Sequence, residues 1–198
     1  MDRVTVINTL IEKCGYTRYL EIGCQQNISF DAIRAPHKVG VDPVRGGTIR
    51  TTSDKYFART KDAFDVIFID GDHHHAQVHR DIKNALAHLR PNGTIVMHDC
   101  LPPTLEYESV AYCHTAWRAF AQAREEQDLE AFCCDFDFGV GIVRQLPNSA
   151  PISLGKTMDD LTYDDLVANR ATWMRPVNFE TFLAKLEVPT WLTGPLFG

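Results

Sequence analysis

The residues best suited to chemistry lie between positions 70 and 99. An Asp-Gly-Asp-His-His-His run covers residues 70–75 directly after an apolar run, and a His-Asp pair at 98–99 follows a second apolar run. Carboxylates bind hard divalent cations through oxygen, and imidazole exchanges a proton near neutral pH. This combination predicts general-base chemistry, metal-assisted chemistry, or both.

The first acids after these apolar runs are Asp70 and Asp99. If the runs are neighbouring parallel strands, their carboxyl ends meet at one edge of the sheet, and the two carboxylates lie close together. Like charges so placed repel unless a cation lies between them, so a shared divalent ion is one interpretation. Asp72 has the ordinary alternative of a helix cap, and His74 and His75 that of solvent-facing side chains.

Two earlier strand ends also carry acids. Glu21 and Gly23 end the first apolar run, where a glycine lets a ligand approach the backbone and a carboxylate can meet a cationic group. Asp42 closes the second run, at the position where doubly wound folds commonly bind ribose hydroxyls. These positions predict a ligand site along one edge of the sheet.

The elements that must position these residues alternate between strand and helix patterns. We expect an α/β fold, a doubly wound, Rossmann-like and mostly parallel sheet of seven strands whose last strand is antiparallel. A break at 147–151 separates a domain at 1–146 from a linker and helical appendage at 147–198. Strands are expected at 18–23, 37–42, 48–51, 64–69, 94–97, 129–134 and 138–143, and helices at 3–14, 29–34, 54–59, 78–89, around 117–121, at 159–173 and at 178–186.

Composition excludes several classes of protein. The chain has 198 residues, 20 Lys and Arg against 26 Asp and Glu, and a net charge of −6, which disfavours binding to nucleic-acid phosphates. No apolar run approaches the ~20 residues that span a bilayer, and the first residues lack the pattern of a signal peptide. The six cysteines form no CxxC pair. We therefore expect a soluble, cytoplasmic protein without nucleic-acid or membrane partners.

Several of these motifs together resemble class I S-adenosylmethionine-dependent methyltransferases. The resemblance is narrower to a bacterial group of small-molecule O-methyltransferases that includes antibiotic- and sugar-modifying enzymes. It covers about residues 15–145, and its most specific part runs from 64 to 99. The motifs are Tyr19-Leu20-Glu21-Ile22-Gly23, Val39-Gly40-Val41-Asp42-Pro43, the stretch 52–57, Phe64 to His73, and Pro91 to Asp99.

The resemblance implies a role for each matching position. It implies that Glu21 and Gly23 hold the methionine part of the cofactor, that Asp42 accepts the ribose hydroxyls, and that Asp70 contacts the cofactor. His73 matches the general base. Asp70 and Asp99 match a metal pair, and His98, in place of an acid, adds a softer ligand that favours Mn²⁺ beside Mg²⁺. Adenine contacts are implied for Ser53 and Asp54.

The implied activity is methyl transfer to a hydroxyl of a small molecule, a sugar or polyhydroxylated metabolite, in preference to N-methylation. The first turn departs from the family, because Gln25 and Asn27 stand where glycines are common; asparagine tolerates a positive φ. Two alternatives stay open: a non-catalytic cofactor-binding partner subunit, and a metallohydrolase that uses the His-Asp cluster. The apolar residues of the tail leave room for a homodimer contact; they are Trp173, Phe179, Phe182, Trp191, Leu196 and Phe197.

Overall fold

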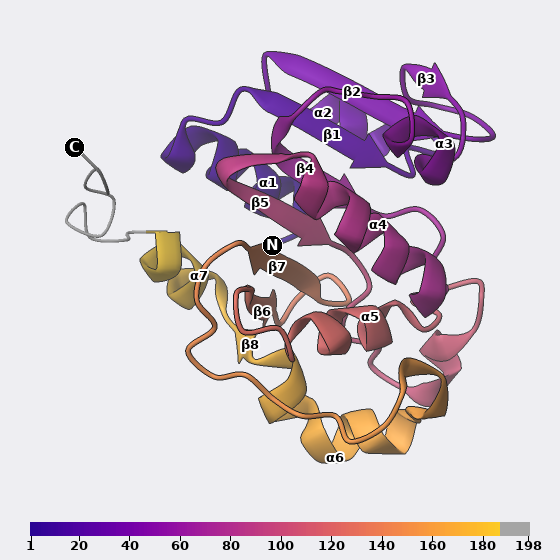
Figure 1. The fold of residues 1–198 in the computed structure, drawn as a ribbon, viewed down its shortest axis with the longest axis vertical. Coiled ribbons are helices and arrows are strands. Elements are labelled where there is room, and N and C mark those ends of the chain that lie inside the picture. Colours follow the sequence, from indigo (N-terminus) through magenta and orange to yellow (C-terminus); the bar gives the residue numbers. More distant parts are fainter. Residues whose placement is uncertain (187–198) are drawn as a thin grey trace.

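The computed structural model describes residues 1–186, and an eight-stranded sheet forms its centre (Figure 1). The strands are β1 (Arg18–Ile22), β2 (His37–Asp42), β3 (Ile49–Arg50), β4 (Phe64–Ile69), β5 (Leu89–Met97), β6 (Glu130–Cys134), β7 (Val140–Arg144) and β8 (Pro176–Val177). The helices are α1 (Arg3–Cys14), α2 (Ile28–Ala32), α3 (Ser53–Phe57), α4 (His75–Ala87), α5 (Ala116–Ala123), α6 (Tyr163–Met174) and α7 (Phe179–Leu186), with 3₁₀ turns at Leu105–Glu108 and Met158–Asp160.

The strand order is β3-β2-β1-β4-β5-β7-β6-β8. Strands β1 to β5 run parallel, β7 is antiparallel to both β5 and β6, and β8 pairs parallel with β6. The chain leaves β1 toward β2 on one side and later returns to place β4 on the other side. The carboxyl ends of β1 and β4 therefore flank the topological switch point, where open α/β sheets bind ligands.

Helices cover both faces of the sheet. Alternate residues of β4 point to opposite faces, so Ile67 and Ile69 join one buried cluster and Val66 and Phe68 join the other. The first cluster includes side chains of α3, α4, α5 and α6, and the second includes side chains of α1, α2 and α7. The near-continuous apolar sequence of β4 follows from this coverage on both faces.

Helix boundaries follow local chemistry. The side chain of Asp2 accepts a hydrogen bond from the Thr5 N–H and so caps the start of α1, and Gly15 ends that helix with a left-handed φ of 67°. In α6, Thr162 and Asp165 form a reciprocal capping box. The α/β fold predicted from the sequence is confirmed at this level.

The seven-strand prediction was wrong, because β8 adds a two-residue eighth strand beside β6. Two residues are too few to show an alternating pattern. The helix expected at 78–89 ends at Ala87, and residues 91–93, expected as a turn, lie inside β5, where the backbone of Asn92 has a φ of 63°. Leu89 already pairs with Phe64, and the β4–β5 register shifts between Phe64 and Val66, which accommodates this turn-like sequence within the strand.

Residues 147–186 share the cores of the preceding part. Leu166, Trp173 and Met174 of α6 belong to one buried cluster, and Phe182 of α7 belongs to the other. Within residues 1–186, no helix is long and apolar enough to cross a membrane. Of the tail residues considered for a homodimer contact, Trp173, Phe179 and Phe182 pack in or against the chain's own cores, and Trp191, Leu196 and Phe197 lie outside the described residues.

Candidate active site

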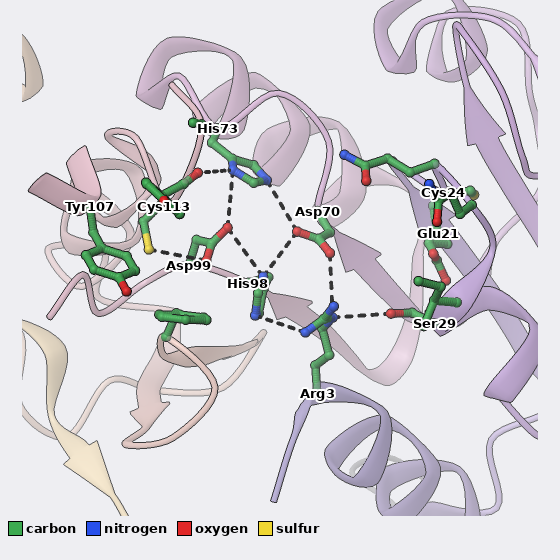
Figure 2. Close-up of a pocket in the computed structure, with 17 residues that line it drawn as sticks. Arg3, Glu21, Cys24, Ser29, Asp70, His73, His98, Asp99, Tyr107 and Cys113 are labelled. Carbon is green, nitrogen blue, oxygen red and sulfur yellow. Dashed lines mark hydrogen bonds and ion pairs between the residues drawn. The ribbon is translucent and has the colours of Figure 1, made fainter. Parts of the chain in front are cut away.

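Two cavities open at the carboxyl ends of the strands. The first, here the histidine cavity, has a volume of about 230 Å³ and is lined by Arg3, Glu21, Asp70, His73, His98 and Asp99 among others (Figure 2). The second, here the Asp42 cavity, has a volume of about 580 Å³ and is lined by Asp42, Ser53, Asp54 and Gln77 among others. Gly23, Gln25 and Asp70 line both. Every site residue predicted from the sequence lines one of the two cavities, and the roles assigned to these residues remain predictions.

Gly23 joins the two cavities at the switch point. Its φ is 90°, and a Cβ atom built there would lie 2.2 Å from the backbone oxygen of Asp70. Any other residue would force the ends of β1 and β4 apart. The following turn adopts the left-handed conformation at two non-glycine residues, Gln25 with a φ of 43° and Asn27 with a φ of 63°. The expectation that Asn27 tolerates a positive φ is confirmed, and Gln25 adopts one as well.

Asp42 is buried and is surrounded by backbone donors. One carboxylate oxygen accepts hydrogen bonds from the N–H groups of Cys24 at 3.1 Å and Gln25 at 2.9 Å. The other accepts from the N–H groups of Val44 at 2.7 Å and Arg45 at 2.8 Å. Although burial acts in the opposite direction, these donors hold the pKa of Asp42 below its ordinary value. The carboxylate thus fixes the turns that follow β1 and β2.

The start of α3 supplies the polar end of the Asp42 cavity. Thr52 caps this helix through its side chain, and Ser53 and Asp54 are its first two residues. The Gln77 side chain of α4 donates to the Ser53 hydroxyl at 3.2 Å and to an Asp54 oxygen at 3.3 Å. Gln77 was not predicted from the sequence, because nothing in α4 alone indicates which of its polar side chains faces α3.

The histidine cavity is built around four charged or titratable side chains. His73 lies between two carboxylates, with Nε2 3.3 Å from Asp70 and Nδ1 3.2 Å from Asp99. His98 Nδ1 lies 3.3 Å from each of the same two carboxylates. The expected proximity of Asp70 and Asp99 at neighbouring strand ends is therefore present in the structure.

The carboxylates and imidazoles shift one another's pKa. Although burial opposes the change, Asp70 and Asp99 raise the pKa of His73 to about 9. Although burial again opposes the change, Asp137 and Asp70 raise the pKa of His98 far above its ordinary value. The backbone carbonyl of Tyr112, 2.8 Å from His73 Nδ1, can only accept a hydrogen bond. A neutral His73 with its proton on Nδ1 therefore has its lone pair on Nε2, next to Asp70.

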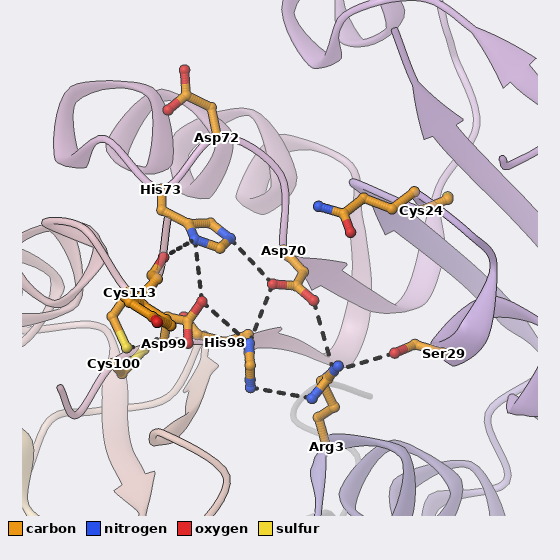
Figure 3. A network of polar contacts seen from close by, with 12 residues as sticks. Arg3, Cys24, Ser29, Asp70, Asp72, His73, His98, Asp99, Cys100 and Cys113 are labelled. Carbon is orange, nitrogen blue, oxygen red and sulfur yellow. Dashed lines mark hydrogen bonds and ion pairs between the residues drawn. The ribbon is translucent and has the colours of Figure 1, made fainter. Parts of the chain in front are cut away.

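Two residues from distant parts of the chain, Arg3 and Asp137, complete the polar network, and Figure 3 shows Arg3 beside Asp70 and His98. Arg3, the first residue of α1, donates through Nη1 to both oxygens of Asp137, at 3.1 and 3.0 Å, and its Nε lies 3.7 Å from Asp70. Arg3 Nη1 also lies 3.3 Å from His98 Nε2. Neither Arg3 nor Asp137 was predicted from the sequence, in which 134 positions separate them.

Asp137 belongs to a strained turn between β6 and β7. Asp137 and Phe138 have φ values of 50° and 57°, and Gly139 follows with a φ of 89°. A left-handed conformation costs a non-glycine residue roughly 1–2 kcal/mol. Phe138 lines the histidine cavity, where its ring packs against Tyr107 at 5.4 Å and edge-on to His98 at 6.4 Å. The turn thus directs one acid and one aromatic ring toward the cluster.

Glu21 contributes a buried carboxylate to the same cavity. It is 1% exposed and accepts a hydrogen bond from the buried Tyr19 hydroxyl. Burial raises the pKa of Glu21 to about 7, although the Tyr19 hydroxyl counteracts it. No role was predicted for Tyr19 from the sequence, and the structure shows that it supports Glu21.

The donor set suits a divalent cation. One oxygen each of Asp70 and Asp99 and one nitrogen of His73 lie within 4.8 Å of one another. Two carboxylates and an imidazole are ligands for Mn²⁺ and, through the oxygens, for Mg²⁺. His98 Nδ1 is close to both carboxylates, and the Arg3 guanidinium is close to Asp70, so these cationic side chains share the acids that a metal would use.

Comparison with known proteins supports the same interpretation of the fold. Residues 10–100 match the methyltransferase domain family, and no curated protein matches the chain. The cofactor-bound Rv0187 protein from MTB is 17% identical, with a TM-score of 0.58 over 74% of this chain and 80% of that one. The SAH-bound methyltransferase PaMTH1 from Podospora anserina is 17% identical, with a TM-score of 0.55 over 72% and 77% of the two chains.

A third solved structure is the O-methyltransferase TomG from Streptomyces achromogenes, which is involved in tomaymycin synthesis and was solved with SAM. It is 13% identical, with a TM-score of 0.55 over 73% of this chain and 79% of that one. Identities this low show a shared fold. Residues 10–100 therefore match a methyltransferase domain model, and the chain shares its fold with these solved structures, two of which are methyltransferases that hold SAH or SAM.

Proposed function

We propose that the chain transfers the methyl group of S-adenosylmethionine to a hydroxyl oxygen of a small molecule, with His73 as the general base. The observation that carries this proposal is the position of His73. Its ring lies beside Asp70, and Asp70 lines both cavities. A base at that junction can act on an acceptor in one cavity while the adenosyl group is held in the other.

The Asp42 cavity suits an adenosyl group in size and in chemistry. Its volume of about 580 Å³ lies within the ~300–1,000 Å³ typical of small-ligand sites. Ser53, Asp54 and Gln77 offer hydrogen-bonding groups for the adenine ring of the cofactor. At the junction, the carboxylates of Glu21 and Asp70 can attract the sulfonium and ammonium groups of the cofactor. We assign Glu21, Gly23, Asp42, Ser53, Asp54 and Asp70 to cofactor binding on this basis.

The cofactor supplies an electrophilic methyl carbon, so the protein must align the acceptor oxygen with it and exclude water. Asp99 and the Tyr112 carbonyl hold the His73 ring from the Nδ1 side. They leave Nε2 to take the hydroxyl proton as the new oxygen–carbon bond forms. Because its pKa is about 9, His73 holds a proton at neutral pH in this cluster, and base catalysis should increase as the pH rises toward 9.

We propose that Asp70, His98 and Asp99 bind Mg²⁺ or Mn²⁺, which leaves His73 as the base. Such an ion would lower the pKa of the acceptor hydroxyl. Titration of the protein with Mn²⁺, followed by electron paramagnetic resonance, tests this part separately. An Asp99→Asn variant should bind Mn²⁺ at least tenfold more weakly; equal binding by both proteins would exclude the site.

We propose a sugar or other polyhydroxylated metabolite as the acceptor. The aromatic rings of Tyr107, Tyr112 and Phe138 line the histidine cavity and can pack on the face of a ring-shaped acceptor. The test is transfer of a labelled methyl group from S-adenosylmethionine to a panel of sugars, polyols, phenols and amines. Labelling of amines alone would contradict oxygen as the acceptor atom.

A further inference from the structure

Asp81 is a buried acid that the proposed chemistry does not use. It lies on α4, is 1% exposed, and does not line either cavity. Its Oδ1 accepts a hydrogen bond from Gln77 Nε2 at 3.1 Å, and its Oδ2 has no hydrogen-bond partner within residues 1–186. A buried carboxylate with one unpaired oxygen destabilises a fold, so its other contact needs an explanation.

The contact links Asp81 to the wall of the Asp42 cavity. Residues four apart on a helix share one face, which places Gln77 directly over Asp81. The same Gln77 Nε2 lies within 3.3 Å of Ser53 and Asp54 on α3, the helix beside α4 (Figure 1). All three neighbours of Nε2 offer oxygen acceptors, and Asp81 is the one that lies outside the cavity.

These acceptors determine which end of the Gln77 amide is the donor. An amide side chain can rotate by 180° and exchange its N–H₂ group for its carbonyl. With Nε2 directed toward Asp81, Ser53 and Asp54, the rotated amide would place its carbonyl oxygen against oxygen atoms. Oε1 therefore remains on the other side of the amide, where it accepts a hydrogen bond from Arg80 and has a second lone pair available.

We propose that Asp81 is a positioning residue that fixes the orientation of the Gln77 amide, and through it the preference of the Asp42 cavity for adenine. Adenine presents a 6-amino donor, which an oriented carbonyl oxygen accepts. Hypoxanthine presents a 6-oxo acceptor, which the same oxygen repels. The inference rests on the proposed function, because it takes the adenosyl group as the ligand.

The experiment is calorimetric titration of the full chain with S-adenosylhomocysteine and with S-inosylhomocysteine, which differ in this 6-substituent and in the adjacent N1, an acceptor in adenine and an N–H donor in hypoxanthine. The wild-type protein should bind the adenosyl compound at least tenfold more tightly. In Asp81→Ala, the amide loses its buried acceptor and is oriented only by Ser53 and Asp54, which themselves line the cavity, so this ratio should fall to about threefold or less. Asp81→Asn keeps an oxygen that can accept from Gln77, so it should restore most of the ratio.

Two further variants separate positioning from loss of structure. Ile82→Ala removes a neighbouring buried side chain of the same helix that does not line the Asp42 cavity; it should lower Tm and leave the ratio unchanged. Gln77 is partly exposed, so Gln77→Ala should fold even if Asp81→Ala does not. This variant should bind the adenosyl and inosyl compounds with similar affinity. Adding Asp81→Ala to Gln77→Ala should then change the ratio no further.

Failure of the inference about Asp81 and failure of the proposed function give different binding results. Tight binding of S-adenosylhomocysteine with an unchanged ratio in Asp81→Ala or Gln77→Ala overturns the role of Asp81 and leaves the proposed function standing. Equal affinity of the wild-type protein for the two compounds would also overturn the role of Asp81 and leave the proposed function standing. If the wild-type protein binds neither compound, the proposed function fails together with the inference.

Discussion

The Asp42 cavity and the histidine cavity share Gly23 and Asp70, yet they are held together by contacts of different range. Asp42 bonds to backbone N–H groups no more than 18 positions away. In the histidine cavity, Arg3 bonds to Asp137 across 134 positions and contacts His98 across 95. The proposed cofactor side is therefore formed by local turns, whereas the proposed acceptor side is assembled from distant segments.

The two cavities therefore differ in what holds their acids: backbone conformation on the Asp42 side and charged side chains on the histidine side. On the Asp42 side, four backbone N–H groups at two strand ends hold the acid, and the one ion-pair partner among the described residues is the half-exposed Arg50, 3.7 Å away. On the histidine side, acids are neutralised by Arg3, His73 and His98, side chains that can be replaced one at a time. Single substitutions on the histidine side should thus alter chemistry, and those on the Asp42 side should alter binding or stability.

The largest effect is expected for His73→Ala. Removal of a general base typically lowers turnover by ~10²–10⁴, and cofactor affinity should stay nearly intact because Nε2 serves the acceptor. Labelled-methyl transfer measures the first quantity, and titration with S-adenosylhomocysteine measures the second. His37→Ala, at the opposite end of the sheet, is the control. Unchanged turnover in His73→Ala would remove His73 from the mechanism.

Gly23→Ala should affect both cavities at once. The new Cβ would meet the Asp70 backbone oxygen, and the φ of 90° is strained for alanine. We expect a loss of about 3 kcal/mol in the free energy of unfolding. Gly15→Ala is a matched control, because Gly15 has a φ of 67° and a Cβ added there would meet no atom within 4 Å; it should lose only about 1 kcal/mol. Equal losses in urea unfolding would contradict the tight junction of β1 and β4.

Asp81→Asn tests a difference between two buried acids near the Asp42 cavity, Asp81 and Asp42, whose pKa values shift in opposite directions. Although the Ser53 and Gln77 side chains counteract it, burial raises the pKa of Asp81 from 3.8 to about 6, whereas the pKa of Asp42 is lowered. The stability that a raised pKa contributes is fully present below pH 3.8 and is lost as the pH rises through 6. The variant should be about 3 kcal/mol more stable than the wild type at pH 8 and nearly equal to it at pH 4. Thermal unfolding at both pH values measures this, and an equal difference at the two would contradict the raised pKa.

Arg3→Gln should have a smaller effect, and Arg18→Gln a smaller one still. Both arginines form an ion pair at 3.0 Å and have similar exposure, but the Asp137 side chain is 14% exposed and the Asp62 side chain is 56% exposed. Losing the partner of a half-buried acid should cost about 1.5 kcal/mol, reduced from the fully buried case by solvent. The exposed pair should cost about 0.5 kcal/mol. Equal costs in urea unfolding would show that the long-range Arg3–Asp137 pair stabilises the fold no more than an exposed pair does.

Much of the fold could be predicted from the sequence because its signals are local. The β4 run is apolar at nearly every position, and the predicted bounds of β2 and β4 agree with the structure. Residues 89–93 could not be assigned correctly, because Pro91 and Gly93 resemble a turn and only pairing with β4 makes this segment a strand. The two-residue β8 has no pattern of its own and exists through its pairing with β6.

The residues of the candidate site likewise fall into those that local sequence patterns predict and those that they do not. Asp42 ends β2, Asp70 directly follows β4, and Asp99 lies two residues after β5, so their proximity follows from the topology of a parallel sheet. Arg3 lies at the start of a helix, and Asp137 lies in a turn; neither position predicts a partner. Their pairing depends on how α1 and the β6–β7 turn pack around His98, which is information that no local pattern contains.

Calorimetric titration of the metal-stripped protein with S-adenosylhomocysteine, repeated with Mg²⁺ and Mn²⁺, tests the central claim most directly. We predict saturable binding at one site per chain, retained in His73→Ala. Absence of binding under all three conditions would contradict the assignment of the Asp42 cavity to the adenosyl group, and with it the proposed methyl transfer.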